Sequence, residues 1–343
     1  MLACPNRNVY ANSLRKQFAQ TSALRTRRED ETMTSPTSVL TPPLSRRERT
    51  RRSPLNRRIA MAGWGFVLPF FVGFVLFVVV PVLYSIYLSM YRDQLIGGNH
   101  FVGFANYLQA FTDTGFWSGV LRVSLFLVVQ VPVMLVLALM CALAIDSGRL
   151  HAKSFFRIIL FLPYAVPGVV AVLMWGFMYN PRAGLTGALG HLLGMTIDPI
   201  STQWVLPAIG NIVTWEFIGY NMLIFYAALS TIPTELYEAA AIDGAGAFRT
   251  VVSIKLPALR GAVMITTIFS IIGSFQLFNE PNILRTTALG VIPTNFTPNL
   301  YAYTLSFLGN QINYAATIAI IMGVVTAIVA YIVQLRGTRK DAR

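Results

Sequence analysis

Six long apolar stretches dominate this chain of 343 residues. Each is long enough to cross about 30 Å of hydrocarbon as a helix. Backbone polar groups within a bilayer must be satisfied inside each spanning segment, and we see no alternating strands of the kind that a closed barrel requires. The sequence therefore predicts an all-α integral membrane protein with six transmembrane helices. The predicted spans are about Trp64–Tyr84, Val120–Ile145, Ile158–Met178, Val205–Leu229, Val263–Leu284 and Ala315–Leu335.

Composition agrees with a membrane protein and argues against catalysis. Charged residues make up 12% of the chain, about half the usual ~25% of a soluble domain. The two cysteines, Cys4 and Cys141, and the three histidines, at 100, 151 and 191, are too scattered for a disulfide framework or a zinc site. We find no GxxxxGK[ST] phosphate loop and no GxSxG elbow. We expect no enzymatic activity, metal or cofactor in this chain, so any ATP that drives it must be bound by another protein.

The positive charge is concentrated at the N-terminus. Residues 1–58 hold 13 Lys/Arg and 4 Asp/Glu, which is +9 of the net charge of +13. This stretch is poor in apolar residues and rich in Ser, Thr and Pro, so we predict a disordered basic cytoplasmic tail and no nucleic-acid binding. The transmembrane domain is then residues 59–336, and residues 337–343 form a short C-terminal tail. We also hypothesise that translation starts at Met33.

Loop charges set the predicted orientation, because cytoplasmic loops carry an excess of Lys and Arg. With the N-terminus inside, ten basic residues lie in inside loops and the C-terminal tail, and four lie outside. Both termini are therefore predicted to be cytoplasmic. The external loops are then about residues 85–118, 179–203 and 285–312.

A polar segment rich in small residues separates the fourth and fifth predicted spans. It reads Glu238-Ala-Ala-Ala-Ile-Asp-Gly-Ala-Gly246, and Ile254-Lys-Leu-Pro257 follows. Pro233 and Thr234 suit a helix start, and the glycines at 244 and 246 suit a helix end with positive φ. Leu256-Pro257 should then open the next helix. The charge rule places this segment on the cytoplasmic side.

This segment resembles the "EAA loop" of the membrane subunits of binding-protein-dependent ABC importers. In that family the loop is a short helix, roughly parallel to the membrane, that seats in a cleft of an ATP-binding subunit. The resemblance implies a type I ABC importer permease in a bacterial or archaeal cell (inner) membrane. Its implied partners are a second permease subunit, a dimer of ATP-binding subunits that binds ATP and Mg, and an extracytoplasmic solute-binding protein that docks on the external loops. The implied coupling residues are Glu238, Ala239, Ala240, Asp243, Gly244, Ile254, Leu256 and Pro257.

Three further motifs resemble those of the carbohydrate branch of this family. They are Phe101-Val-Gly-Phe-Ala-Asn-Tyr107, Leu162-Pro-Tyr-Ala-Val-Pro-Gly168 and Ser274-Phe-Gln-Leu-Phe-Asn-Glu-Pro281. Together they imply a sugar substrate, in particular a di- or oligosaccharide. Two departures are visible, since the chain lacks the extra helices and large external domain of some maltose-type permeases, and Asn279 stands where many relatives have Asp.

Polar residues inside the predicted spans are the candidate sugar contacts, because such groups are costly in a bilayer unless they are paired or face a wet cavity. The resemblance to the maltose-transporter permease implies Tyr164 as a sugar contact and places Gly168, Ser270 and Ser274 near the sugar. Pro163 and Pro167 should kink the helix around Tyr164. The full set of candidates is Tyr164, Gly168, Glu216, Tyr220, Ser270, Ser274 and Gln276. Four of them have a structural alternative. Tyr164 could be a packed aromatic, Glu216 a carboxylate bonded to a neighbouring helix, and Ser270 and Ser274 could bond to the preceding turn.

Other functions stay open on the sequence alone. Within the same class, the substrate is alternatively glycerol phosphate or another polyol. From a different class, a secondary active transporter would also carry polar residues at mid-membrane, but we see no convincing internal repeat of the kind such carriers often have.

Overall fold

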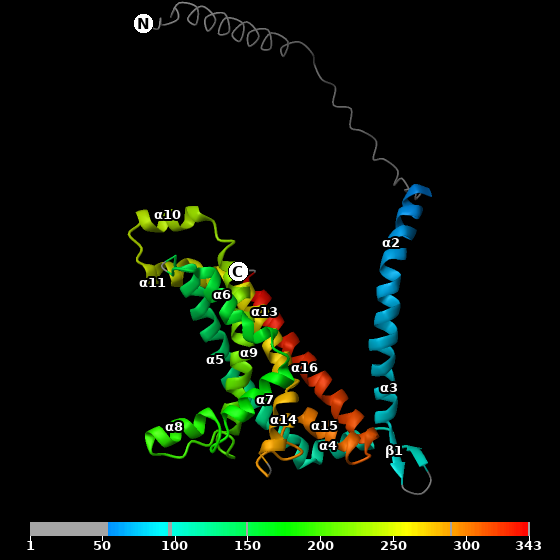
Figure 1. Cartoon of the computed structure of the whole chain (residues 1–343). Helices are drawn as coiled ribbons and strands as arrows, with labels where there is room; N and C mark the ends of the chain where they lie inside the picture. Colours follow the sequence, from blue (N-terminus) through cyan, green and yellow to red (C-terminus); the bar gives the residue numbers. More distant parts are fainter. Residues whose placement is uncertain (1–53, 95–97, 149, 289, 342–343) are drawn as a thin grey trace, which may run out of the picture. The chain divides into compact units, whose positions relative to one another are not determined.

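The structure is a computed structural model that describes residues 54–94, 98–148, 150–288 and 290–341 (Figure 1). The described residues divide at Pro69 into two units. Most of the predicted N-terminal tail and the proposed start at Met33 lie outside the described residues. Residues 54–58, which that tail included, are helical, and so are residues 337–341 of the predicted C-terminal tail.

The described residues are mainly helical. The first helices are α2 (Pro54–Phe74), α3 (Val80–Ser89), α4 (Ala105–Thr112), α5 (Thr114–Asp146), α6 (Lys153–Phe161), α7 (Gly168–Met178), α8 (Leu185–Leu193) and α9 (Val205–Leu229). They are followed by α10 (Thr234–Ile242), α11 (Ala247–Thr250), α12 (Leu256–Ala258), α13 (Arg260–Phe275), α14 (Asn279–Thr287), α15 (Pro298–Phe307) and α16 (Ile312–Asp341). A hairpin of β1 (Tyr91–Gln94) and β2 (Gly98–Phe101) precedes α4.

The described helices agree with six predicted spans in number, but two of the spans are broken. Four segments are continuous and apolar enough to cross a membrane: Ala62–Ser89, Thr114–Asp146, Val205–Leu229 and Ile312–Gly337. The third of these has the bounds that the sequence predicts. Two bent helix pairs supply the others, one from α6 and α7 and one from residues 247–275.

The predicted third span bends by 97° between its two helices. Residues Leu162–Ala165 form a short 3₁₀ turn, and Val166 is extended, with ψ of 129°. Pro167 explains this, because a proline disfavours helical backbone at the residue before it. The predicted kink is therefore confirmed, and it is large enough to separate two helices.

The predicted fifth span, Val263–Leu284, is wrong at its second half. Helix α13 stops at Phe275, and a separate helix, α14, begins at Asn279. Pro281 fits this start, since a proline is tolerated in the first turn of a helix, where its missing N–H has no partner. The carbonyls freed at the break are satisfied from the chain near α15: the Thr297 hydroxyl donates to the Leu277 oxygen at 2.9 Å, and the Asn299 amide donates to the Phe275 oxygen at 3.3 Å.

Helices α5 and α9 pack along each other through a buried core, and α16 packs on α13, α15 and α3. Figure 1 shows α10 and α11 at one end of these helices and α8, α14 and α15 at the other. Asp113 ties together the end that carries α15. Its Oδ2 accepts hydrogen bonds from the hydroxyls of Tyr301 (2.9 Å) and Tyr314 (2.7 Å). Burial and the hydrogen bond to Asp113 raise the pKa of Tyr301 to about 12, so the tyrosine keeps its proton and stays a donor.

The Phe101–Tyr107 motif has a structural role at the same end. Asn106 is 1% exposed, and its amide donates to the backbone oxygens of Ser89 at 2.9 Å and Tyr91 at 2.8 Å. Its oxygen accepts from the Arg92 guanidinium at 2.9 Å. The motif therefore fixes α4 against the end of α3.

Candidate functional site

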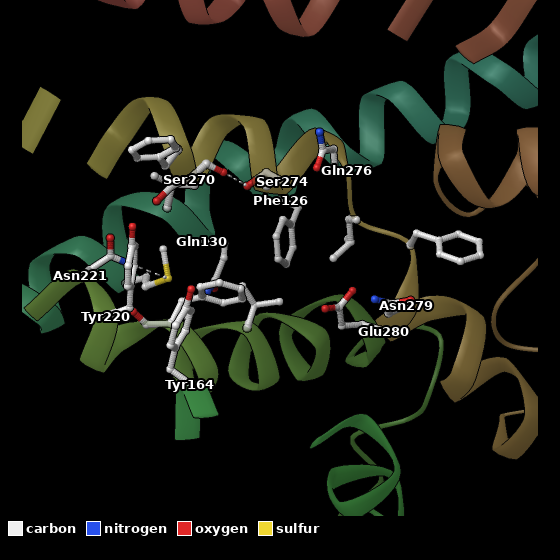
Figure 2. Close-up of a pocket in the computed structure, with 18 residues that line it drawn as sticks. Phe126, Gln130, Tyr164, Tyr220, Asn221, Ser270, Ser274, Gln276, Asn279 and Glu280 are labelled. Atoms are coloured by element: carbon white, nitrogen blue, oxygen red, sulfur yellow. Dashed lines mark hydrogen bonds between the residues drawn. The ribbon is translucent and has the colours of Figure 1, made fainter. Parts of the chain in front are cut away.

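A cavity of about 380 Å³ lies between α5, α9 and α13, and we call it the inner cavity (Figure 2). It is lined by Tyr164 from the 3₁₀ turn before α7 and by residues 276–280 from the segment between α13 and α14 and the start of α14. Non-helical backbone at membrane depth is tolerated where it is buried in protein or lines a cavity. Its polar lining residues are Gln130, Tyr164, Tyr220, Asn221, Ser270, Ser274, Gln276, Asn279 and Glu280.

Five of the seven candidate sugar contacts line this cavity together. They are Tyr164, Tyr220, Ser270, Ser274 and Gln276, and they come from the broken third span, from α9 and from the end of α13. The structure thus brings together residues that are up to 112 positions apart in the sequence.

Gly168 and Glu216 do not line the inner cavity. They lie beside each other, because a β-carbon built on Gly168 would be 3.4 Å from an Oε of Glu216. Glu216 is only 8% exposed, on the face of α9 that meets the start of α7. The structure therefore separates these two candidates from the other five.

Aromatic rings form one wall of the inner cavity. The ring of Tyr164 stacks on that of Tyr220, with centroids 4.9 Å apart and planes 17° from parallel, and meets Phe217 edge-on at 5.7 Å. Figure 2 shows Tyr164 and Tyr220 side by side at one end of the cavity. Their hydroxyls supply polar tips to an otherwise apolar wall, a combination that suits a ligand with both C–H faces and hydroxyls.

The other polar side chains of the cavity form hydrogen bonds within the chain and keep further hydrogen-bonding capacity for a ligand. The Ser274 hydroxyl donates to the backbone oxygen of Ser270 at 2.8 Å, which is the bond to the preceding turn expected of its structural alternative. The oxygen of a hydroxyl that donates can still accept two hydrogen bonds. On α9 the Asn221 amide donates to the Phe217 oxygen at 3.0 Å, and Thr214 accepts from Gln130 at 2.5 Å.

Gln130 and Glu280 were not among the sequence candidates. Gln130 is the amide in the middle of the apolar run of α5, and a polar residue in such a place is itself a functional signal. Glu280 was predicted to lie in the same helix as Ser270. The break after α13 instead turns it toward the inner cavity.

Close backbone contact holds the broken third span against α9. A β-carbon built on Gly219 would overlap the carbonyl oxygen of Leu160 and lie 2.7 Å from the α-carbon of Phe161. Only a glycine allows this approach. The contact between α9 and residues 160–161 sets the position of the turn that carries Tyr164.

At the opposite end of the helices, α10 has no buried residue. The start at Thr234 is confirmed, and Gly244 ends the helix with φ of +70°, as the sequence predicts. Gly246 differs from the prediction, because its φ is −69° and it caps the start of α11. Leu256 and Pro257 also differ, since the helical path resumes at Ala247, nine residues earlier than expected.

The exposed surface of α10 and α11 combines small, acidic and large apolar side chains. Glu238, Ala239 and Asp243 are exposed, and so are Ile242 (86%) and Phe248 (82%). Large apolar groups exposed within a polar segment are typical of protein contacts. Ile254 is half-buried, whereas Leu256 and Pro257 are exposed, and Ala240 is half-buried.

An ion pair joins this segment to α5. Lys255 donates to Asp146, the last residue of α5, at 2.5 Å, and its ammonium lies 5.5 Å from the ring centre of Tyr237 on α10. Burial and the nearby Asp146 charge raise the pKa of Tyr237. Asp146, Tyr237 and Lys255 therefore connect α5, α10 and the helical segment before α12.

The bent spans, the inner cavity and the protruding α10 together define a membrane-spanning transport subunit. A family model described as "Binding-protein-dependent transport system inner membrane component" matches residues 114–339. The chain belongs to this family.

Curated relatives agree with this placement. The chain is similar to the lactose transport system permease protein LacF of Rhizobium radiobacter, with 31% identity over 82% of this chain and 96% of that protein. It is 34% identical to the diacetylchitobiose uptake system permease protein NgcF of Streptomyces coelicolor, over 76% and 78% of the two chains. A crystal structure of a bacterial ABC transporter for the acidic polysaccharide alginate contains a chain of the same fold, with a TM-score of 0.72 at 18% identity, covering 83% of this chain and 98% of that one.

Proposed function

We propose that this chain is a permease subunit of an ATP-driven importer, which carries a di- or oligosaccharide from an extracytoplasmic solute-binding protein into the cytoplasm. The observation that carries the proposal is the inner cavity, which five residues proposed from the sequence as sugar contacts line together, beside the break of the third span and the end of α13. The names of relatives support a carbohydrate, since they refer to lactose, diacetylchitobiose and trehalose/maltose.

The chemistry of the inner cavity suits a saccharide. Sugars present hydroxyls that both donate and accept, and flat C–H faces that pack on aromatic rings. Hydroxyl and amide side chains such as those of Ser270, Gln276 and Asn279 match the first requirement, and Tyr164 with Tyr220 matches the second. In this arrangement the sugar ring lies against the tyrosines, and its hydroxyls face the polar end of α13.

Coupling to ATP is assigned to the segment around α10. A separate ATP-binding dimer, which holds ATP and Mg, receives this helix on its surface. Glu238, Ala239, Ala240 and Asp243 lie on α10 or at its end, and the exposed Ile242 adds apolar area. Gly244 sets the turn that follows, while Ile254, Leu256 and Pro257 connect the segment to α13.

Movement caused by ATP then reaches the inner cavity through the continuous chain and through packed side chains. Movement of α10 reaches α5 through Lys255 and Asp146, and reaches α13 through the helical path from Ala247. Helices α5, α9 and α13 all line the inner cavity. ATP shifts the population between inward-open and outward-open states only because the ATP-binding dimer binds α10 differently in the two.

The remaining parts of the proposal concern assembly and orientation. A second permease subunit completes the translocation path. Both termini and α10 lie on the cytoplasmic side, and the external loops receive the solute-binding protein.

The experiment is uptake into proteoliposomes that contain this chain, its second permease and the ATPase, with the binding protein outside. Labelled lactose, maltose, diacetylchitobiose and glycerol 3-phosphate are supplied in parallel. We expect uptake of at least one disaccharide that requires ATP and stops with vanadate. Uptake of glycerol 3-phosphate alone would overturn the saccharide assignment. Uptake that persists without ATP and is abolished by a protonophore would replace the importer with a secondary carrier.

A further inference from the structure

The charge of the inner cavity is carried by one residue, Glu280. Among the 18 residues that line the cavity, it is the one with a charged side chain, and none of them is Lys, Arg or His. In Figure 2 its carboxylate points into the cavity, on the far side from Tyr164 and Tyr220. The described residues provide it with no ion-pair partner.

The position of Glu280 follows from the break in the fifth span. It is the second residue of α14, where a carboxylate is favoured by the N-terminus of the helix. Burial raises the pKa of Glu280, and a hydrogen bond from its own backbone opposes this rise. The carboxylate oxygens face the cavity, where they can accept hydrogen bonds from a ligand.

A second acid, Glu216, lies beside Gly168 outside the cavity lining and is coupled electrostatically to Glu280. Because like charges repel strongly where the local dielectric is low, a negative charge on Glu280 opposes a second negative charge nearby. An anionic ligand in the inner cavity would meet the Glu280 charge without a compensating cation from this chain's lining.

We propose that Glu280 is a specificity-determining residue: it makes the inner cavity select neutral or amino saccharides and reject saccharides that carry carboxylate, sulfate or phosphate. The inference rests on the proposed function, and it specifies which charge the transported saccharide can carry. Hydroxyls and ammonium groups of a sugar donate to the carboxylate, and charge-assisted hydrogen bonds are about twice as strong as neutral ones. Anionic saccharides are rejected because the negative charge of Glu280 repels them.

The test measures equilibrium binding to the purified complex of both permeases and the ATPase. The binding protein is left out so that it cannot impose its own selectivity. The probes are lactose, maltose and diacetylchitobiose, each paired with the derivative whose non-reducing-end CH₂OH is oxidised to carboxylate. For the wild type we expect at least one neutral probe to bind about 100-fold more tightly than its acidic partner, as like-charge contacts predict.

Three variants test whether the charge of Glu280 determines the ratio of the two affinities. Glu280→Gln removes it with little change in shape and is expected to bring the neutral-to-acid affinity ratio below about tenfold. Glu280→Asp keeps the charge and is expected to retain most of the ratio. Asp198→Asn removes the same charge from an exposed loop outside the inner cavity and should leave the ratio unchanged.

The outcomes separate the two proposals. An equal ratio in the wild type and Glu280→Gln, or equally tight binding of both probes by the wild type, overturns the role of Glu280 and leaves the saccharide site standing. Binding of no probe by the wild type overturns the saccharide site and this inference with it.

Discussion

The close approach of α9 to the broken third span predicts that Gly219→Ala is strongly destabilising. The added β-carbon would overlap the Leu160 carbonyl oxygen and lie 2.7 Å from the Phe161 α-carbon. Carbon atoms in contact are normally about 3.5–4.0 Å apart, so the two segments would have to separate by roughly 1 Å. Backbone atoms cannot rotate away as a side chain can. We therefore expect a loss of about 3 kcal/mol in the free energy of unfolding, the upper end for overpacking.

The assay is equilibrium unfolding of the purified complex in mixed detergent micelles, followed by tryptophan fluorescence. The matched control is Gly323→Ala in α16, where a β-carbon would have nothing within 4 Å. The control should be neutral or stabilising by up to about 1 kcal/mol, because alanine favours a helix more than glycine does. Equal stability of the two variants would refute the close approach and the position it gives to Tyr164.

Three further predictions concern binding and coupling. Tyr164→Ala should weaken disaccharide binding about tenfold, as loss of a ring contact and a hydrogen bond predicts, with assembly unchanged and with Tyr164→Phe closer to the wild type in a titration. Lys255→Met should lower stability by about 2 kcal/mol, because it strands the Asp146 charge, and adding Asp146→Asn should recover part of the loss in the same unfolding assay. Gly244→Pro should abolish copurification with the ATPase, since φ is +70° there and proline is fixed near −65°; full transport by this variant would contradict the role of α10.

Much of the fold could be predicted from the sequence because bilayer thickness fixes the length of an apolar run. Helix α9 has the predicted bounds, Val205–Leu229, since polar and turn-forming residues flank it on both sides. The prediction of the second half of the fifth span was wrong for a physical reason. A hydropathy count accepts Leu277 and Phe278 as part of a span, but it cannot show that α15 supplies donors for the carbonyls released at the break.

The candidate site was predicted in part, for similar reasons. Tyr164 was selected because its motif resembles that of sugar permeases, and the two prolines beside it predicted the kink that the structure shows. Gln130 was missed although its place in an apolar run was visible, because only the packing of α5 on α9 shows that it faces the cavity. Glu216 was selected for its charge, and its position behind Gly168 depends on a bend of 97° that no local pattern specifies.

The most direct test of the account is a map of the complete importer trapped in the presence of the disaccharide that it transports. We expect sugar density in the inner cavity, with a ring face against Tyr164 and hydroxyls within hydrogen-bonding distance of Gln276 and Glu280. Density held entirely by the second permease subunit, with the inner cavity of this chain empty, would contradict the account.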